Sequence, residues 1–167
     1  MNSPDPSVEF VITRTFNAPR ELVFKTMIET EHLQHWWGPK ECTIEVIKHE
    51  PRAGGAFHYC MKFAPGVEMH GLFQYREITP VERLVFTNGF ADAEGNRIRY
   101  AMSPTWPVEV LITNTLTETD GKTTLTMRSE PVDASPIEIE TFKAGHASMT
   151  EGFGGMYDRY AEYLASL

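Results

Sequence analysis

The side chains that could carry chemistry in this sequence are mainly histidines and carboxylates. His32 and His35 stand three residues apart beside Glu29 and Glu31, a spacing at which two histidines of one helix can share a metal ion. Three further histidines fall on separate predicted strands: His49, His58 and His70. A catalytic zinc ion needs a third ligand and groups that orient its ligands, and no pattern here supplies them. We therefore predict no metal site and no cofactor, and interpret the segment as a solvated face.

Neither cysteine has the surroundings of a catalytic nucleophile. Cys42 and Cys60 do not begin a helix, and strand alternation places Cys60 with Lys62, away from the interior, although His58 is close in sequence. No Ser-His-Asp order, glycine-rich phosphate loop or carboxylate pair stands out, so we assign no catalytic residue. Four polar side chains are expected to face inward, where each must bond to protein, water or a ligand: Tyr59, Asn114, His146 and Tyr160.

The large apolar side chains form a clearer pattern. Trp36 and Trp37 could form the wall of a ligand cavity, or one indole could lie in the core while the other closes a corner between helices. Adjacent helical residues cannot face the same way, so both interpretations stay open. From the two tryptophans and the residues expected to face the interior, we predict a set of ligand-binding residues: Trp36, Trp37, Phe57, Tyr59, Met61, Val110, Asn114, His146, Met149, Gly152, Phe153 and Met156.

Hydropathy alternation predicts the elements that must position these side chains. A strand over 8–16 is followed by a helix opening at Ala18-Pro19 and a short helix from Thr30 that ends at Gly38-Pro39. Further strands are expected over 43–48, 56–63, 67–78, 83–90, 106–117 and 123–129, with a long connection over 91–105. Asp120-Gly121 predicts a tight hairpin, and such short connections require antiparallel neighbours.

One long helix is predicted to end the chain and cover the sheet. Ser135-Pro136-Ile137-Glu138 has the pattern of a capping box with proline in the first turn. Four glycines interrupt this helix, although each costs up to about 1 kcal/mol relative to alanine: Gly145, Gly152, Gly154 and Gly155. Either another backbone approaches there, or room is left for a ligand along the stripe from Met149 to Met156. We expect Gly152 or Gly155 to face an open pocket.

Length and composition set the class of protein. With 167 residues the chain predicts one domain, 8–167, after a short disordered tail at 1–7. A net charge of −8 disfavours nucleic acid as a partner, and no apolar run approaches the roughly 18 residues of a membrane span. The N-terminus has no signal-peptide pattern, and two cysteines form no disulfide framework. These features predict a cytoplasmic protein and leave the oligomeric state, including a homodimer, open.

Several local sequences carry a family resemblance over about residues 8–164. They are Ala18-Pro19 with Val23-Phe24, His35 to Pro39, Arg52 to Phe57 with Tyr59 and Met61, Gly71, Glu77 to Thr87, and Glu151-Gly152-Phe153 before the 157–164 stretch. In these segments the chain resembles the START-like (SRPBCC) superfamily. Within it, the chain is similar to bacterial proteins named after the C-terminal domain of the activator of the 90-kDa heat-shock protein's ATPase.

The resemblance implies an α+β helix-grip fold, in which about seven antiparallel strands wrap a long C-terminal helix and enclose a cavity, with two short helices after the first strand. It implies less about activity, because the superfamily includes lipid carriers, polyketide cyclases and hormone receptors. The first hypothesis is therefore binding of a small, largely apolar molecule. The second is a cyclase- or hydrolase-like enzyme using His146 or a tyrosine. The third is a co-chaperone-like regulator of a heat-shock ATPase in a stress response, with a chaperone as partner, which the single predicted domain disfavours.

Overall fold

A computed structural model describes residues 8–167, and the tail predicted at 1–7 lies outside the described residues. Within that range, seven strands form one antiparallel sheet in the order β1-β7-β6-β5-β4-β3-β2. Their bounds are β1 Phe10–Phe16, β2 Cys42–His49, β3 Ala56–Phe63, β4 Val67–Thr79, β5 Arg83–Ala91, β6 Val110–Thr119 and β7 Lys122–Pro131. Two short helices follow β1 and two more end the chain: α1 Arg20–Ile28, α2 Thr30–Trp36, α3 Pro136–Ala144 and α4 His146–Ala165. The α+β helix-grip prediction is confirmed.

The sheet follows from short connections between successive strands. Asp120 and Gly121 join β6 to β7 with φ angles of 53° and 75°, the left-handed conformations that a two-residue turn of this kind requires. β1 pairs along β7, so the first and last strands are neighbours. Register shifts after Val46 in β2 and after Tyr75 in β4 interrupt the pairing, and such bulges bend a strand.

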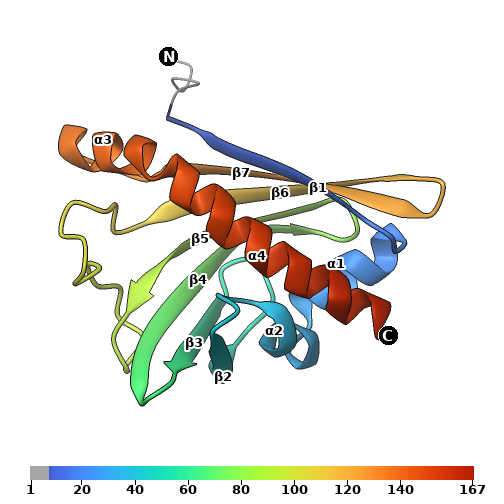
Figure 1. The fold of residues 1–167 in the computed structure, drawn as a ribbon, viewed down its shortest axis with the longest axis horizontal. Helices are drawn as coiled ribbons and strands as arrows, with labels where there is room; N and C mark the ends of the chain where they lie inside the picture. The colour runs from blue at the N-terminus through green and yellow to red at the C-terminus, as the bar shows by residue number, and fades with distance from the viewer. Residues whose placement is uncertain (1–7) are drawn as a thin grey trace.

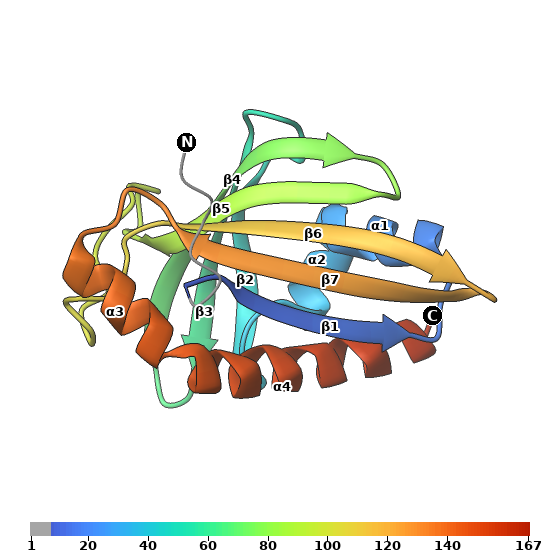
Figure 2. The same cartoon turned by 90° about the horizontal axis from the view of Figure 1, so that it is seen from above.

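Helix α4 crosses in front of the sheet (Figure 1) and runs along β1 at the sheet edge (Figure 2). Aromatic pairs fix it to β1: Phe153 packs on Phe10 with ring centroids 5.9 Å apart, and Tyr157 meets Phe16 edge-on at 6.0 Å. α1 and α2 lie beneath the C-terminal end of α4 (Figure 1). The long helix therefore has different neighbours at its two ends.

The single C-terminal helix of the prediction is broken into α3 and α4 at Gly145. Its start is as expected: the Glu138 amide donates to Ser135 Oγ at 3.3 Å, and Glu138 Oε1 accepts from the Ser135 amide at 2.8 Å. At Gly145 an added Cβ would lie 2.9 Å from Trp106 Cζ3. The indole therefore packs against the bare backbone of the break, which explains a glycine there.

Two residues on the outer face of β3 are buried, which alternation alone did not predict. His58 and Cys60 are 5% and 2% exposed, and Gly95, in the connection from β5 to β6, lies beside the His58 ring. His58 and His70, expected to be scattered, share a hydrogen bond between Nε2 and Nδ1 at 2.9 Å. Burial, with a smaller contribution from His70, lowers the pKa of His58.

Candidate ligand-binding cavity

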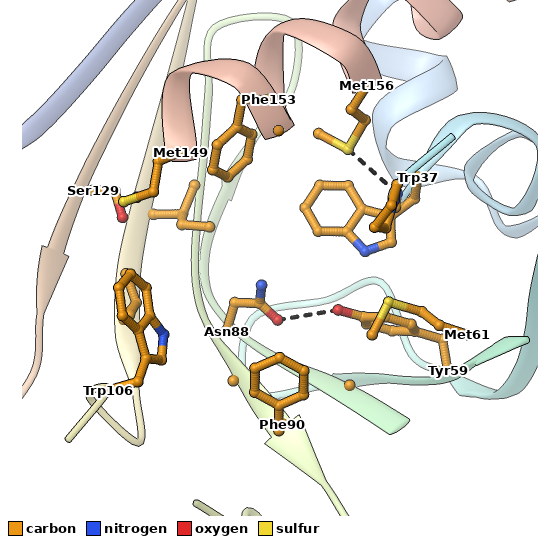
Figure 3. A pocket seen from close by; sticks show the side chains of 17 residues that line it. Trp37, Tyr59, Met61, Asn88, Phe90, Trp106, Ser129, Met149, Phe153 and Met156 are labelled. Carbon is orange, nitrogen blue, oxygen red and sulfur yellow. Dashed lines mark hydrogen bonds between the residues drawn. The ribbon is translucent and has the colours of Figure 1, made fainter. Parts of the chain in front are cut away.

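A cavity of about 280 Å³ lies between the inner face of the sheet and the N-terminal half of α4 (Figure 3). Its walls come from α4, from strands β3 to β7, from the end of α2 and from the connection before β6. The lining residues are Trp37, Gly38, Pro39, Tyr59, Met61, Gly71, Asn88, Gly89, Phe90, Trp106, Val110, Ile112, Ser129, Met149, Gly152, Phe153 and Met156. Eight of them belong to the predicted set: Trp37, Tyr59, Met61, Val110, Met149, Gly152, Phe153 and Met156.

Trp37 is positioned by the way α2 ends. Gly38 has φ +94°, a conformation that favours glycine, and Pro39 cannot continue the helix, so the chain turns sharply after the indole. The Gly38 amide donates to the Met156 sulfur at 3.3 Å, which ties this turn to α4. The Trp37 ring meets Phe73 edge-on at 4.7 Å. Trp37 therefore forms a rigid wall.

Tyr59 lies over Gly71 of the neighbouring strand, and its ring occupies the place that a Cβ there would take. The Tyr59 hydroxyl donates to Asn88 Oδ1 at 3.3 Å, and the Asn88 amide nitrogen points into the cavity (Figure 3). Burial raises the pKa of Tyr59 to about 12, against smaller opposing effects of its hydrogen bonds with Trp37 and Asn88. The tyrosine is therefore neutral at physiological pH.

Trp106 reaches the cavity from the connection between β5 and β6. The prediction placed it in a strand, but β6 begins at Val110, and residues 92–109 form an irregular segment. The Trp106 ring packs on Phe142 of α3 at 5.5 Å. Near it, Phe90 of β5 stacks on Tyr100 with centroids 4.3 Å apart. Phe90 of β5 and Trp106 of the irregular segment therefore give one end of the cavity an aromatic wall.

Four predicted site residues do not line the cavity. Trp36 donates from its indole nitrogen to the Thr26 carbonyl at 2.9 Å and stacks on Tyr160, so it belongs to the helix core. Phe57 is fully buried among the rings of β3 and β4. Asn114 is buried on β6 beyond the end of the cavity. His146 bonds through Nε2 to the Val8 carbonyl at 3.0 Å, because the first turn of α4 lies beside the start of β1.

The lining carries no residue that is charged at neutral pH. None of the described lining residues is Asp, Glu, Lys, Arg, His or Cys, and the polar side chains among them are Tyr59, Asn88, Ser129 and the two indole nitrogens. Such a surface suits an uncharged, apolar molecule held by a few hydrogen bonds. It offers no pair of nucleophile and base.

The predicted histidine-rich face has a packing role on α2. His32 Nδ1 bonds to the Tyr163 hydroxyl at 2.6 Å, and the His35 ring stacks on Tyr163 at 5.3 Å. Ligand atoms of Glu29, Glu31 and His32 lie within 4.8 Å of one another. Glu31 is exposed and the other two are half-buried.

Comparison with known proteins agrees with this architecture. Residues 17–165 match the family model described as activator of Hsp90 ATPase homolog 1-like protein. The chain belongs to this family. A search of curated proteins gives no significant match.

Solved structures of bacterial proteins show the same fold. A protein from Arthrobacter aurescens is 23% identical, with a TM-score of 0.81 over 99% of this chain and 91% of that one. A protein from Nitrosomonas europaea is 23% identical, with a TM-score of 0.75 over 99% of each chain. The AHSA1 protein from Silicibacter pomeroyi is 18% identical, with a TM-score of 0.69 over 94% of this chain and 97% of that one. No helix among residues 8–167 is long and apolar enough to cross a membrane.

Sequence reasoning missed half of the lining in this family member. The missed residues are Gly38, Pro39, Gly71, Asn88, Gly89, Phe90, Trp106, Ile112 and Ser129. For Ile112 a signal existed, because it shares the alternation of Val110. Asn88 and Phe90 lie on the same face of β5 as the buried Phe86, so strand alternation could also have identified them. Trp106 shares the parity of Val110 in the predicted strand 106–117, but it lies outside β6, so its place in the lining comes from an irregular segment that has no period.

Proposed function

We propose that the protein binds a small, largely apolar molecule in the cavity between the sheet and α4. The observation that carries the proposal is the unfilled space of about 280 Å³ between the sheet and the N-terminal half of α4, which is lined mostly by apolar side chains. Gly152 borders this space at an exposed position of α4, and a Cβ added there would meet no heavy atom within 4 Å.

The size and lining of the cavity support this function. An apolar cavity of about 150 Å³ stays dry and takes a benzene molecule, so about 280 Å³ suits a molecule of about two rings. Rigid aromatic walls at Trp37, Phe90 and Trp106 offer faces for stacking, while Met61, Met149 and Met156 can adjust to the shape of an occupant. With two free cysteines, we place this activity in a reducing compartment, the cytoplasm.

The enzymatic and chaperone hypotheses have less support from the site. His146, the group invoked as a general acid or base, is bonded to a backbone carbonyl outside the cavity. Tyr59 could donate a proton only weakly, because burial raises its pKa to about 12. A chaperone partner rests on the family description and on no surface feature described above.

The proposal is tested by filling the cavity from the helix side. Gly152→Leu should abolish binding of the neutral two-ring fluorophore 1-naphthylamine while keeping the melting temperature within a few degrees. Gly154→Leu is the matched control, because Gly154 also has no heavy atom within 4 Å of an added Cβ but does not line the cavity. It should bind the probe as the wild type does.

Two results would contradict the proposal. One is probe fluorescence that is enhanced equally by the wild type and by Gly152→Leu, which would place the probe elsewhere on the protein. The other is a wild type that takes up neither this probe nor any smaller neutral aromatic molecule at millimolar concentration.

A further inference from the structure

Two buried polar atoms stand out because they have no partner. Among the described residues, these are the Ser129 hydroxyl oxygen on β7 and the Asn114 side-chain oxygen on β6. The residues are 2% and 4% exposed. Ser129 pairs with Ile112, two residues before Asn114 and on the same inner face, so the two polar groups are diagonal neighbours.

Several other buried hydroxyls among the described residues are bonded. Thr123 donates to the Ala18 carbonyl at 2.7 Å, and Thr26 donates to the Leu22 carbonyl at 2.9 Å. The Tyr160 hydroxyl donates to the Val23 carbonyl at 2.9 Å. An unpartnered buried hydroxyl reduces stability, and replacing it with a methyl group would remove that penalty. Ser129 is thus an exception, and it lies on the cavity wall.

The Ser129 hydroxyl is covered by the structure as it stands. Met149 of α4 lines the same cavity, and its side chain overlaps that of Ser129 in the view of Figure 3. A methionine side chain has three rotatable bonds and can move aside without disturbing the helix. An occupant that moved the thioether would bring its own atoms against Ser129, while its apolar part filled the space between the aromatic walls.

We infer that Ser129 is a specificity-determining residue, and that the cavity takes an uncharged apolar molecule carrying a hydroxyl or similar group that bonds to Ser129 Oγ. The inference rests on the proposed function. The neighbouring Asn114 oxygen can accept a second hydrogen bond from the same group or through a water molecule. The occupant is uncharged because no charged side chain lines the cavity, and a buried charge without a partner is strongly disfavoured.

The test compares two ligands that differ by one hydroxyl. Naphthalene and 2-naphthol are titrated into the wild type and into Ser129→Ala, and binding is followed by amide chemical shifts in NMR spectra. The wild type should prefer 2-naphthol by about fivefold to tenfold, the fold-change expected for one hydrogen bond in a dry site. Ser129→Ala should reduce this preference to about twofold or less, with naphthalene binding unchanged or tighter.

Val110→Ala is the matched control, since it removes apolar wall next to the same strand pair without changing a polar group. It should weaken both ligands alike and keep the preference for 2-naphthol. Ser129→Ala should also melt no lower than the wild type, whereas the loss of a structural hydrogen bond would lower its melting temperature.

The outcomes separate this inference from the function on which it rests. If both ligands bind the wild type and Ser129→Ala keeps the preference, or if the variant is clearly less stable, Ser129 does not determine specificity and the binding function stands. If neither ligand binds the wild type, both the inference and the proposed function fail.

Discussion

The two halves of α4 are built for different purposes. All the buried residues of this helix lie in its second half: Met156, Tyr157, Tyr160 and Leu164. There Tyr160 stacks on Trp36 with centroids 3.8 Å apart and bonds to Thr26 at 2.6 Å, over α1 and α2. The first half carries Gly152 and Gly154, where an added Cβ would touch nothing, and faces the cavity.

This difference shows how one helix can anchor a fold and leave it hollow. The second half has two short helices beneath it, so large side chains can fill the space down to the sheet. Near the first half lies instead the irregular segment 92–109. It contributes Trp106 to the wall of the cavity, and the space between this wall and the helix stays unfilled. The elements that neighbour each half of α4 therefore decide whether that half borders the packed core or the cavity.

The largest expected effect comes from breaking the packed half. Tyr160→Ala removes a ring stacked on Trp36 and a hydroxyl bonded to the Val23 carbonyl, and should lower the free energy of unfolding by about 3–5 kcal/mol. Phe153→Ala, a half-buried ring on the cavity wall, should cost only about 1–2 kcal/mol. Urea unfolding measures both, and equal losses would mean that the two halves are packed alike.

The second expected effect is a loss of stability at alkaline pH. Burial raises the pKa of Tyr59 to about 12, and also raises the pKa values of Tyr157 and Tyr160. Unfolded tyrosines ionise near pH 10, so above this pH the unfolded state loses protons that the native state keeps. Stability should therefore fall from about pH 10 upward, by about 2–3 kcal/mol for Tyr59 alone at pH 12.

Urea unfolding at several pH values, together with tyrosinate absorbance, measures this decline. Tyr59→Phe should be less sensitive to alkali than the wild type, because one of the groups that ionise on unfolding is gone. Native tyrosines that all ionise near pH 10 would show that these side chains are hydrated. Such a result would remove the distinction between a dry cavity wall and open solvent.

Much of the fold was predictable because its signals are local. The Ser135 capping box, the Asp120-Gly121 turn and the stop at Gly38-Pro39 each depend on a few adjacent residues, and each lies where expected. Alternation placed all seven strands within a few residues of their observed bounds. The break at Gly145 was not predicted, since its cause is a tryptophan 39 positions away in sequence.

The site was only half predictable, for a related reason. Alternation shows which face of a strand points inward, but not whether a helix packs on that face or stands away from it. Phe57 and Tyr59 share a face, yet Phe57 is packed among rings while Tyr59 borders the cavity. Nor could alternation show that Ser129, one polar residue in a strand, would be left without a partner.

A third prediction compares two glycines on the C-terminal helices. Gly152→Ala should raise the free energy of unfolding by about 0.4–1 kcal/mol, since alanine restricts the unfolded chain and meets no atom within 4 Å. Gly145→Ala should instead lower it by about 1–3 kcal/mol, because its Cβ would lie 2.9 Å from Trp106 Cζ3. Gly154→Ala serves as a reference outside the cavity lining and should resemble Gly152→Ala. A stabilising Gly145→Ala would mean that Trp106 moves away at no cost.

The smallest expected effect on global stability concerns the segment that closes the hollow half. Arg99 Nη1 donates to the Pro104 carbonyl at 2.8 Å and to Glu138 Oε2 at 3.0 Å, which ties the segment 92–109 to the start of α3. The Arg99 side chain is 47% exposed, so Arg99→Ala should cost less than about 1 kcal/mol. The local effect should be larger, because without a strand or helix this segment depends on such contacts for order.

Amide hydrogen exchange distinguishes the local effect from the global one. In Arg99→Ala the amides of residues 92–109 should exchange faster while those of β6 and β7 keep their protection, since a segment with few buried contacts opens independently of the sheet. Arg14→Ala is the control: it breaks an exposed ion pair of 2.6 Å with Asp158 and should leave the segment unchanged. If exchange in 92–109 is the same in Arg99→Ala and the wild type, the aromatic contacts of Phe90 and Trp106 hold the segment by themselves. Aromatic packing would then order the neighbours of both halves of α4. The remaining difference between the halves would be the glycines of the first half.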